Sequence, residues 1–354
     1  MKKCLKYSTV VFSSLVGVLL IIWLFNYSGL HDIWVHFKKI GLWQWLTIFG
    51  LTMLTVFFRV IRLKIIIEDV VIDKKILLKT YFKSKITEFT VSYLTPMMYV
   101  GGEWPQAYVL KKDAGIPVMQ GLFSSLIEKI VDVLSFFALI FFTGILFLIE
   151  GKSFFGWLII ALTMTIFVIL YFLMELIGID KLLLFLSKIL GLNKVNYKSD
   201  IIGKTSVGER ITTLGKEVSA YLHRKETRLY LAIIFTLITF LLWFTQVYII
   251  LSAMGLHLQF DDLLIIKVLT LLSTLIPIPA DVGALEGAYV VSFGLINLPA
   301  QAAIALSLVM RFFDFILIVC GISFIIHYTR RLVFNFVGLL EKENENNNNS
   351  KDNP

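Results

Sequence analysis

The sequence is poor in charged residues, in cysteine and in grouped histidines. Only 16% of its 354 residues are charged and 58% are hydrophobic, whereas soluble domains average about 25% charged and about 45–50% apolar residues. The two cysteines, Cys4 and Cys320, cannot build a disulfide framework or a metal site, and the five histidines have no ligand spacing. We therefore expect no metal and no cofactor.

The sequence also lacks the short motifs of common enzyme chemistry. It contains no P-loop, no G-x-S-x-G turn and no H-E-x-x-H zinc motif. A membrane glycosyltransferase or lipid phosphatase would need a metal-binding Asp pair or a basic phosphate-binding signature, and neither is found. We expect a protein that is not an enzyme. The alternative is a membrane-embedded enzyme that depends on Glu103 or Glu286.

Long runs without Asp, Glu, Lys or Arg account for the scarcity of charge. They cover residues 7–30, 40–58, 133–148, 153–174, 229–260 and 315–329. A bilayer core about 30 Å thick requires roughly 20 apolar residues of helix. We therefore expect an all-α polytopic membrane protein with about six spanning helices. The first run is longer than a signal-peptide core and is expected to be retained.

The distribution of Lys and Arg indicates the orientation in the membrane. Basic residues precede the first run, follow the second at Arg59 and Arg62, and recur in residues 177–228. Positive connections remain in the cytoplasm, so we expect both termini there, in a cell (inner or plasma) membrane. Arg59 and Arg62 are expected to be topology anchors rather than ligands. Nucleic acid is not an expected partner.

Two segments differ in composition from the membrane domain, which we place at residues 1–338. Residues 177–228 mix Leu and Ile with Lys and Glu at helical spacing, which favours amphipathic helices on the cytoplasmic face. Residues 339–354 are polar and low in complexity. Because such a segment cannot bury a core, we expect a disordered tail.

The chain also contains an internal repeat. SYLTPMMYVGGEWPQAYV (92–109) aligns with STLIPIPADVGALEGAYV (273–290) at an offset of 181, with seven of 18 positions identical. At an offset of 182, Lys129 aligns with Arg311 and Asp132 with Asp314. We expect repeat units at about 92–149 and 273–328. Their second helices should cross the membrane in opposite directions, an inverted arrangement that many secondary transporters use.

Each repeat unit contains a bend rich in proline and glycine. Residues 95–105 contain two Pro and Gly-Gly, and residues 277–287 contain two Pro and two Gly that are not adjacent to each other. Pro ends or kinks a helix and Gly permits the bend. Because backbone without hydrogen bonds is costly in lipid, such bends must be buried or line a watery cavity. We expect two re-entrant helix pairs, with ordinary surface loops as the alternative.

Charged residues at these bends and on the following helices are the candidates for a lipid path. Lys129 and Asp132 are three residues apart, as are Arg311 and Asp314, so each pair can meet on one helix face. Such pairs either tie helices together or present a cation to an anionic head group. The substrate-path candidates are Gly101, Gly102, Glu103, Glu128, Lys129, Asp132, Pro277, Pro279, Asp281, Gly283, Glu286, Gly287, Arg311 and Asp314.

These motifs resemble a known family. GGEWPQAYVLKKDAG followed by EKIVD resembles the G-G-E…E-R-x-x-D pattern of the lysylphosphatidylglycerol synthase transmembrane region family. IPIPADVGALEGAYV followed by MRFFDF is similar to its P-x-P-x-x-x-G-x-x-E-G segment and the helix after it. The resemblance covers about residues 6–331. Lys129 replaces the usual Arg, which keeps the charge but lacks the bidentate fork. Met310 replaces an aromatic residue.

The resemblance implies a function. The family is named after longer proteins in which a membrane flippase domain precedes a soluble aminoacyl-transferase domain, and we expect that second domain to be absent here. A flippase-like protein would translocate an anionic phospholipid or a polyprenyl-phosphate-linked lipid between leaflets, with membrane lipids as its partners. The alternative is a noncatalytic membrane partner of a lipid-modifying or glycosyltransferase enzyme, which would dock on residues 180–228.

Overall fold

The computed structural model describes residues 29–70, 76–95, 101–149, 226–274 and 278–349, with isolated positions between 19 and 23, between 151 and 168, and at 276. The first and fourth predicted spans lie mostly outside these residues. The same holds for the predicted amphipathic segment 177–228, for Pro277 and for part of the first bend.

Every regular element in the described ranges is helical. In chain order the helices are α2 (Leu30–Lys38), α3 (Leu42–Val70), α4 (Leu78–Leu94), α5 (Glu103–Ala114), α6 (Val118–Ile149), α10 (Glu226–Ala253), α11 (Phe260–Ser273), the 3-10 turn η2 (Pro279–Asp281), α12 (Ala284–Leu295) and α13 (Ala300–Asn349).

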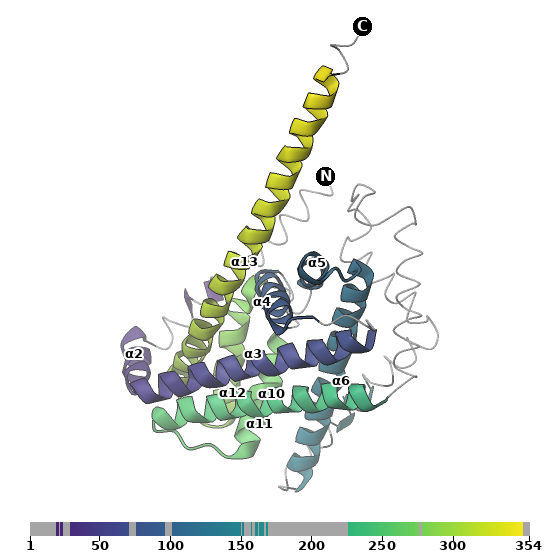
Figure 1. Ribbon diagram of the computed structural model, residues 1–354. Helices are drawn as coiled ribbons and strands as arrows, with labels where there is room; N and C mark the ends of the chain where they lie inside the picture. The colour runs from purple at the N-terminus through teal and green to yellow at the C-terminus, as the bar shows by residue number, and fades with distance from the viewer. Residues whose placement is uncertain are drawn as a thin grey trace, which may run out of the picture.

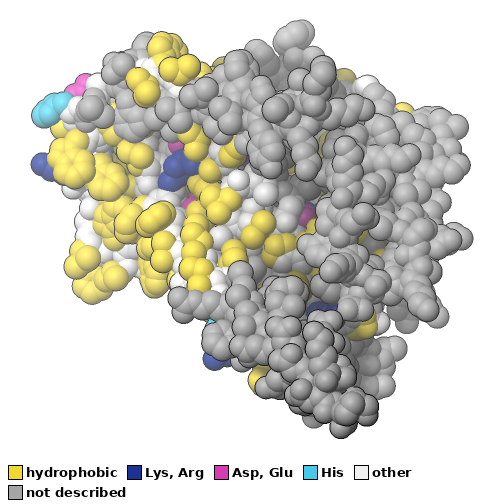
Figure 2. Space-filling model, turned by 90° about the horizontal axis from the view of Figure 1, so that it is seen from above, with side chains coloured by type: hydrophobic (Ala, Val, Ile, Leu, Met, Phe, Trp, Pro, Cys, Tyr) yellow, Lys and Arg dark blue, Asp and Glu magenta, His cyan; other side chains and the backbone are white. Residues whose placement is uncertain are grey.

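Four of the described helices are long and apolar enough to cross a membrane. The qualifying segments are Leu42–Glu68, Val118–Ile149, Arg228–Ala253 and Ala300–Tyr328. Large hydrophobic side chains remain exposed along them, among them Phe57 and Phe142. Figure 2 shows one face on which yellow hydrophobic side chains surround small charged patches. The all-α polytopic membrane fold predicted from the sequence is therefore confirmed.

The described helices follow one order twice. A long helix, two short helices and a second long helix occur as α3, α4, α5 and α6, and again as α10, α11, α12 and α13. The short helices have 17, 12, 14 and 12 residues, too few to cross a bilayer that requires roughly 20. This is the geometry expected of two re-entrant helix pairs.

The two units pack against each other crosswise. Helices α3 and α10 lie side by side (Figure 1) and are antiparallel, because Thr52 meets Gln246 whereas Arg62 meets Thr236. The long helices α6 and α13 run in opposite directions in the same view. Helix α4 of the first unit packs on α13, and α11 of the second packs on α6. Each unit's first short helix is therefore held by the other unit's last long helix.

Glycine allows the bends and the close contact between units. Gly101 and Gly283 have φ values of 122° and 81°, which side chains larger than hydrogen rarely permit. Gly321 of α13 lies directly against α4, where an added Cβ would be 1.8 Å from Thr90 Oγ1. The backbones of α4 and α13 are consequently close together at this point.

The C-terminal segment differs from its prediction. Instead of a disordered tail from residue 339, the structure continues α13 as helix to Asn349. No proline occurs between Pro299 and Pro354 to end the helix. Leu, Glu and Lys in this segment are good helix formers, whereas its five Asn residues up to Asn349 are poorer ones.

Candidate functional site

A buried group of charged side chains, here called the first charged cluster, joins α3, α4, α5 and α6. Three cations and four carboxylates form it through ion pairs between helices. Its members are Arg62, Lys85, Glu88, Glu103, Glu128, Lys129 and Asp132.

Arg62 is the centre of this cluster, with ion-pair partners that its interpretation as a topology anchor did not include. Its side chain is only 4% exposed. It donates to Glu128 Oε1 at 3.3 Å, to Asp132 Oδ2 at 3.2 Å and to Thr236 Oγ1 at 2.7 Å. Because α3 continues to Val70, Arg62 lies inside this helix and is buried among the helices packed on it. The two carboxylates of α6 offset the cost of burying its charge.

The structure separates the predicted Lys129–Asp132 pair. Lys129 donates to Glu88 Oε1 at 3.0 Å and lies 3.8 Å from Glu103, while Asp132 turns to Arg62. Glu128 accepts from Arg62, from Lys85 at 3.0 Å and from Gln106 at 3.2 Å. These ion pairs connect different helices, as in the interpretation in which charge pairs tie the helices together.

A second charged cluster surrounds the bend of the second unit, and Arg311 of α13 is at its centre. The guanidinium binds Glu286 with Nε to Oε1 and with Nη2 to Oε2 at 3.0 Å. It also donates to the backbone carbonyls of Ala280 at 2.9 Å and Asp281 at 3.1 Å. A further bond, 2.8 Å long, goes to the hydroxyl of Tyr93 on α4. Arg311 therefore connects the bend, α12 and the first unit.

The bend carboxylates of the two units have matching roles. Glu286 accepts from the backbone N–H of Gly283 at 2.8 Å and pairs with Arg311. Glu103 accepts from the backbone N–H of Gly101 at 2.7 Å and lies 3.8 Å from Lys129. A carboxylate that reaches back to the start of its helix satisfies an orphan donor there. In both units the same carboxylate also engages a cation on the following long helix.

The remaining candidates from the sequence have smaller or different roles. Asp314 makes no hydrogen bond or ion pair with any described residue, so Arg311 is not its partner as the spacing predicts. Pro279 opens η2. The N–H of Gly287 bonds the carbonyl of Gly283 at 2.9 Å in the first turn of α12. Gly102 packs against α4, where an added Cβ would be 2.2 Å from a backbone oxygen.

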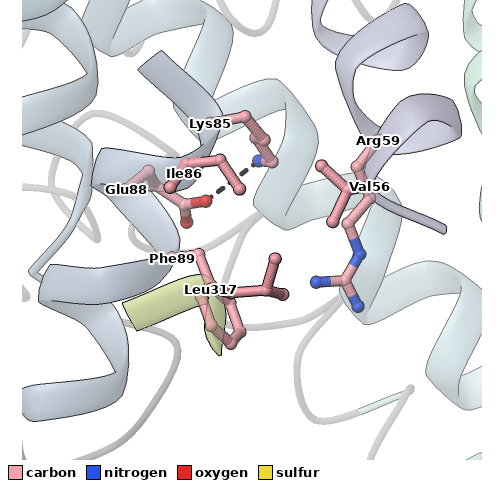
Figure 3. A pocket seen from close by; sticks show the side chains of 7 residues that line it. All are labelled: Val56, Arg59, Lys85, Ile86, Glu88, Phe89 and Leu317. Carbon is pink, nitrogen blue, oxygen red and sulfur yellow. Dashed lines mark ion pairs between the residues drawn. The ribbon is translucent and has the colours of Figure 1, made fainter. Parts of the chain in front are cut away.

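A small pocket lies where α3, α4 and α13 meet, between the two units (Figure 3). The residues that line it are Val56, Arg59, Lys85, Ile86, Glu88, Phe89 and Leu317. Lys85 and Glu88 pair with each other at 3.1 Å, whereas Arg59 forms no hydrogen bond or ion pair with any described residue. The predicted topology anchor Arg59 is thus an exposed guanidinium at the pocket.

Sequence reasoning missed several polar residues of this region. Glu88 and Lys85 sit three apart in a helix that reads as an ordinary connection, and Tyr93 looks like part of the apolar segment before the first bend. Lys267 of α11 carries its amine 4.1 Å from the ring centroid of Trp243. Its signal is visible in the sequence, because a single lysine interrupts an apolar run.

The sequence matches the family described as lysylphosphatidylglycerol synthase TM region over residues 10–321. This chain belongs to that family. The match confirms the resemblance seen in the motifs and includes both bends, both charged clusters and the pocket. A search of curated proteins found no match. As a member of the lysylphosphatidylglycerol synthase TM region family, the chain is a multi-pass membrane protein of a type defined by the membrane region of a lipid synthase.

Proposed function

We propose that this protein translocates a lipid with an anionic head group, a phospholipid or a polyprenyl-phosphate-linked lipid, between the two leaflets of its membrane. One observation carries the proposal. Arg59 presents an unpaired guanidinium at a pocket between the two units. Its depth in α3, its chemistry and the apolar surroundings each support binding of a lipid head group.

Arg59 lies well inside the membrane-length segment Leu42–Glu68. A charge at such depth is costly unless it has a partner or a function. The neighbouring cations Arg62 and Lys129 have carboxylates within ion-pair distance. Among the described residues Arg59 has no carboxylate that close, and Asp314 acts on it only from a longer distance. An arginine in that position is suited to an anion that arrives and leaves. Its planar fork binds phosphate oxygens in bidentate geometry.

The rest of the pocket suits the part of a lipid that joins head group and chains. Val56, Ile86, Phe89 and Leu317 supply an apolar wall, and Figure 3 shows the Arg59 guanidinium beside it. The nearby carboxylate of Glu88 is neutralised by Lys85 and Lys129. Glu88 therefore has cation partners of its own and forms no ion pair with Arg59. The acyl chains can stay in the bilayer while the phosphate passes along the protein.

Lipid movement in proteoliposomes tests the proposal. Fluorescent anionic and zwitterionic lipids would be followed by quenching from outside, for wild type, Arg59→Gln and Lys64→Gln. Lys64 lies on the same helix and makes an exposed pair with Glu68, so it is a matched control. We expect Arg59→Gln to slow anionic lipid about tenfold or more, since a charge-assisted hydrogen bond is worth about 1.5–3 kcal/mol. Lys64→Gln should move lipid as wild type does.

Two results would contradict the proposal. One is a folded wild-type protein that moves no lipid of a broad anionic panel. The other is an Arg59→Gln variant that moves anionic lipids at the wild-type rate. That result would show that the lipid head group does not depend on the pocket at Arg59.

A further inference from the structure

Asp281 at the second bend is a fully buried carboxyl group without a hydrogen-bond donor. Its exposed fraction is 0%, and neither Oδ1 nor Oδ2 receives a hydrogen bond from the described residues. A carboxylate in such a place would be ionised at great cost, whereas a protonated carboxyl is tolerated. The environment therefore favours a proton on Asp281.

The groups that face Asp281 leave it without a free cation. The charged groups that act on Asp281 are Arg311 of α13 and Glu286 of α12. Asp314, Tyr289 and Tyr93 in turn lie around Arg311 and Glu286. Arg311 is the cation among them, and it is already bound to Glu286 through two nitrogens. It reaches only the backbone carbonyl of Asp281, at 3.1 Å. Arg311 is thus the cation near both carboxyl groups, but it forms its ion pair with Glu286 and not with the Asp281 side chain.

The bend itself depends on this arrangement. Ala280 and Asp281 have φ values of 56° and 48°, a left-handed backbone that is unfavourable for residues other than glycine. Arg311 holds both of their carbonyls. If the guanidinium moved from Glu286 to the Asp281 carboxylate, it would release these two carbonyls. The strained backbone of Ala280 and Asp281 could then relax.

Contacts lead from this bend to the pocket. Arg311 donates to the Tyr93 hydroxyl on α4 at 2.8 Å, and the ring of Tyr93 lies 5.7 Å from that of Phe89, which lines the pocket. A shift of the Arg311 guanidinium would therefore alter the packing of Tyr93 and Phe89, and with it the pocket that Arg59 lines.

The titration range of Asp281 is compatible with such a shift. It lies in η2, outside the four spanning helices. Burial raises the pKa of Asp281 to about 7, with a smaller upward effect from Glu286 opposed by Arg311. The carboxyl group would then gain and lose its proton near neutral pH.

We propose that Asp281 is a proton-binding site that couples the second bend to the lipid pocket. With its proton, Asp281 is neutral and Arg311 stays on Glu286, Tyr93 and the bend carbonyls. When the proton leaves to water, the carboxylate competes for the guanidinium, which turns from Glu286 and loosens the link to α4. The transport role rests on the proposed function, but the proton site does not.

Proton binding can be tested without lipid transport. Infrared difference spectra of the purified protein between pH 5 and pH 9 should show a protonated carboxyl band that Asp281→Asn loses and Asp32→Asn keeps. Asp32 is exposed and serves as the control. Because the native pKa is raised, stability present at low pH is lost as pH rises toward about 7. Asp281→Asn should not show this loss of stability as the pH rises toward about 7. An unchanged band and unchanged decline in Asp281→Asn would overturn the proton site.

Transport under an imposed pH gradient tests the coupling. Wild-type proteoliposomes should move anionic lipid several-fold faster with the gradient than without it. Asp281→Asn should still move lipid but ignore the gradient, and Tyr93→Phe should keep the infrared band while losing most of the response. A wild-type rate indifferent to the gradient would overturn the coupling. A wild type that moves no lipid would sink the proposed function while the infrared result still decides the proton site.

Discussion

Arg311 of α13 and Glu286 of α12 bind each other in bidentate fashion across the second bend, with Nη2 3.0 Å from Oε2. Both side chains are largely buried, at 18% and 3% exposure. Each group also satisfies backbone at the bend, so this ion pair determines the path of the chain between α11 and α12. The corresponding groups of the first unit, Lys129 and Glu103, are 3.8 Å apart and form a looser contact.

Replacing Glu286 with glutamine should destabilise the protein strongly. The change leaves the Arg311 charge without its partner, and breaking a buried pair from one side costs about 3–5 kcal/mol. Glu68→Gln is the control, because Glu68 forms an exposed pair with Lys64 and such pairs contribute about 0–1 kcal/mol. Thermal unfolding in mild detergent would measure both. Equal losses of stability in the two variants would show that the bend pair has no special weight.

Arg62 should not tolerate lysine. Its guanidinium reaches Glu128, Asp132 and Thr236 with three different nitrogens, and an ammonium group cannot span this set. We expect Arg62→Lys to lose about 1–3 kcal/mol, and Arg62→Gln more because it strands two buried carboxylates. Unfolding in detergent is again the measurement. A wild-type stability for Arg62→Lys would mean that charge alone suffices at this position.

Gly321→Ala should weaken the contact between α13 and α4. The new methyl group would lie 1.8 Å from Thr90 Oγ1 and 3.0 Å from the Ile86 carbonyl oxygen, and overpacking of this kind costs about 1–3 kcal/mol. Gly294→Ala in α12 is the matched control, since nothing lies within 4 Å of its added Cβ. That change should be neutral or stabilise by about 0.5–1 kcal/mol. If Gly321→Ala behaves like the control, the two helices are not in close contact.

Gly283→Ala should strain the second bend. A side chain at φ 81° costs roughly 1–2 kcal/mol in the left-handed region, and it would disturb the N–H that Glu286 accepts. Gly287→Ala, four residues on in regular helix with open space around it, should be harmless. Limited proteolysis at the bend would compare the two variants. Similar resistance in both would contradict a requirement for glycine at 283.

The sequence predicted the bends and the membrane class well because their signals are local. Clusters of Pro and Gly disfavour a continuous helix, and both bends contain positive-φ glycines, Gly101 and Gly283. The spanning helices predicted from uncharged runs are shorter than the real helices, because charged residues that have partners on other helices lie inside the real ones. The uncharged run 133–148 is only part of α6, since Glu128, Lys129 and Asp132 find partners on other helices.

Partner choice among the charges could not be predicted. Lys129 binds Glu88, 41 residues away in sequence, rather than the nearby Asp132, because α4 packs its carboxylate against α6. Arg59 and Arg62 follow an uncharged run and therefore resemble the end of a span, yet α3 continues to Val70. Only the packing of α4 and α6 on α3 shows that one arginine is buried and the other lines a pocket.

The close contact of Gly321 with Thr90 would act as a pivot point for any rotation of one unit relative to the other. No side chain separates α13 from α4 there, so a tilt of one unit relative to the other would turn about this point with little sliding. Leu317 lies one helical turn away and would hardly move. Arg311 lies ten residues away, about 15 Å along the axis at 1.5 Å per residue, and the same tilt would sweep it through a much longer arc. A rotation of this kind would leave Leu317 in the apolar wall of the pocket nearly in place. It would displace Arg311, which binds the second bend.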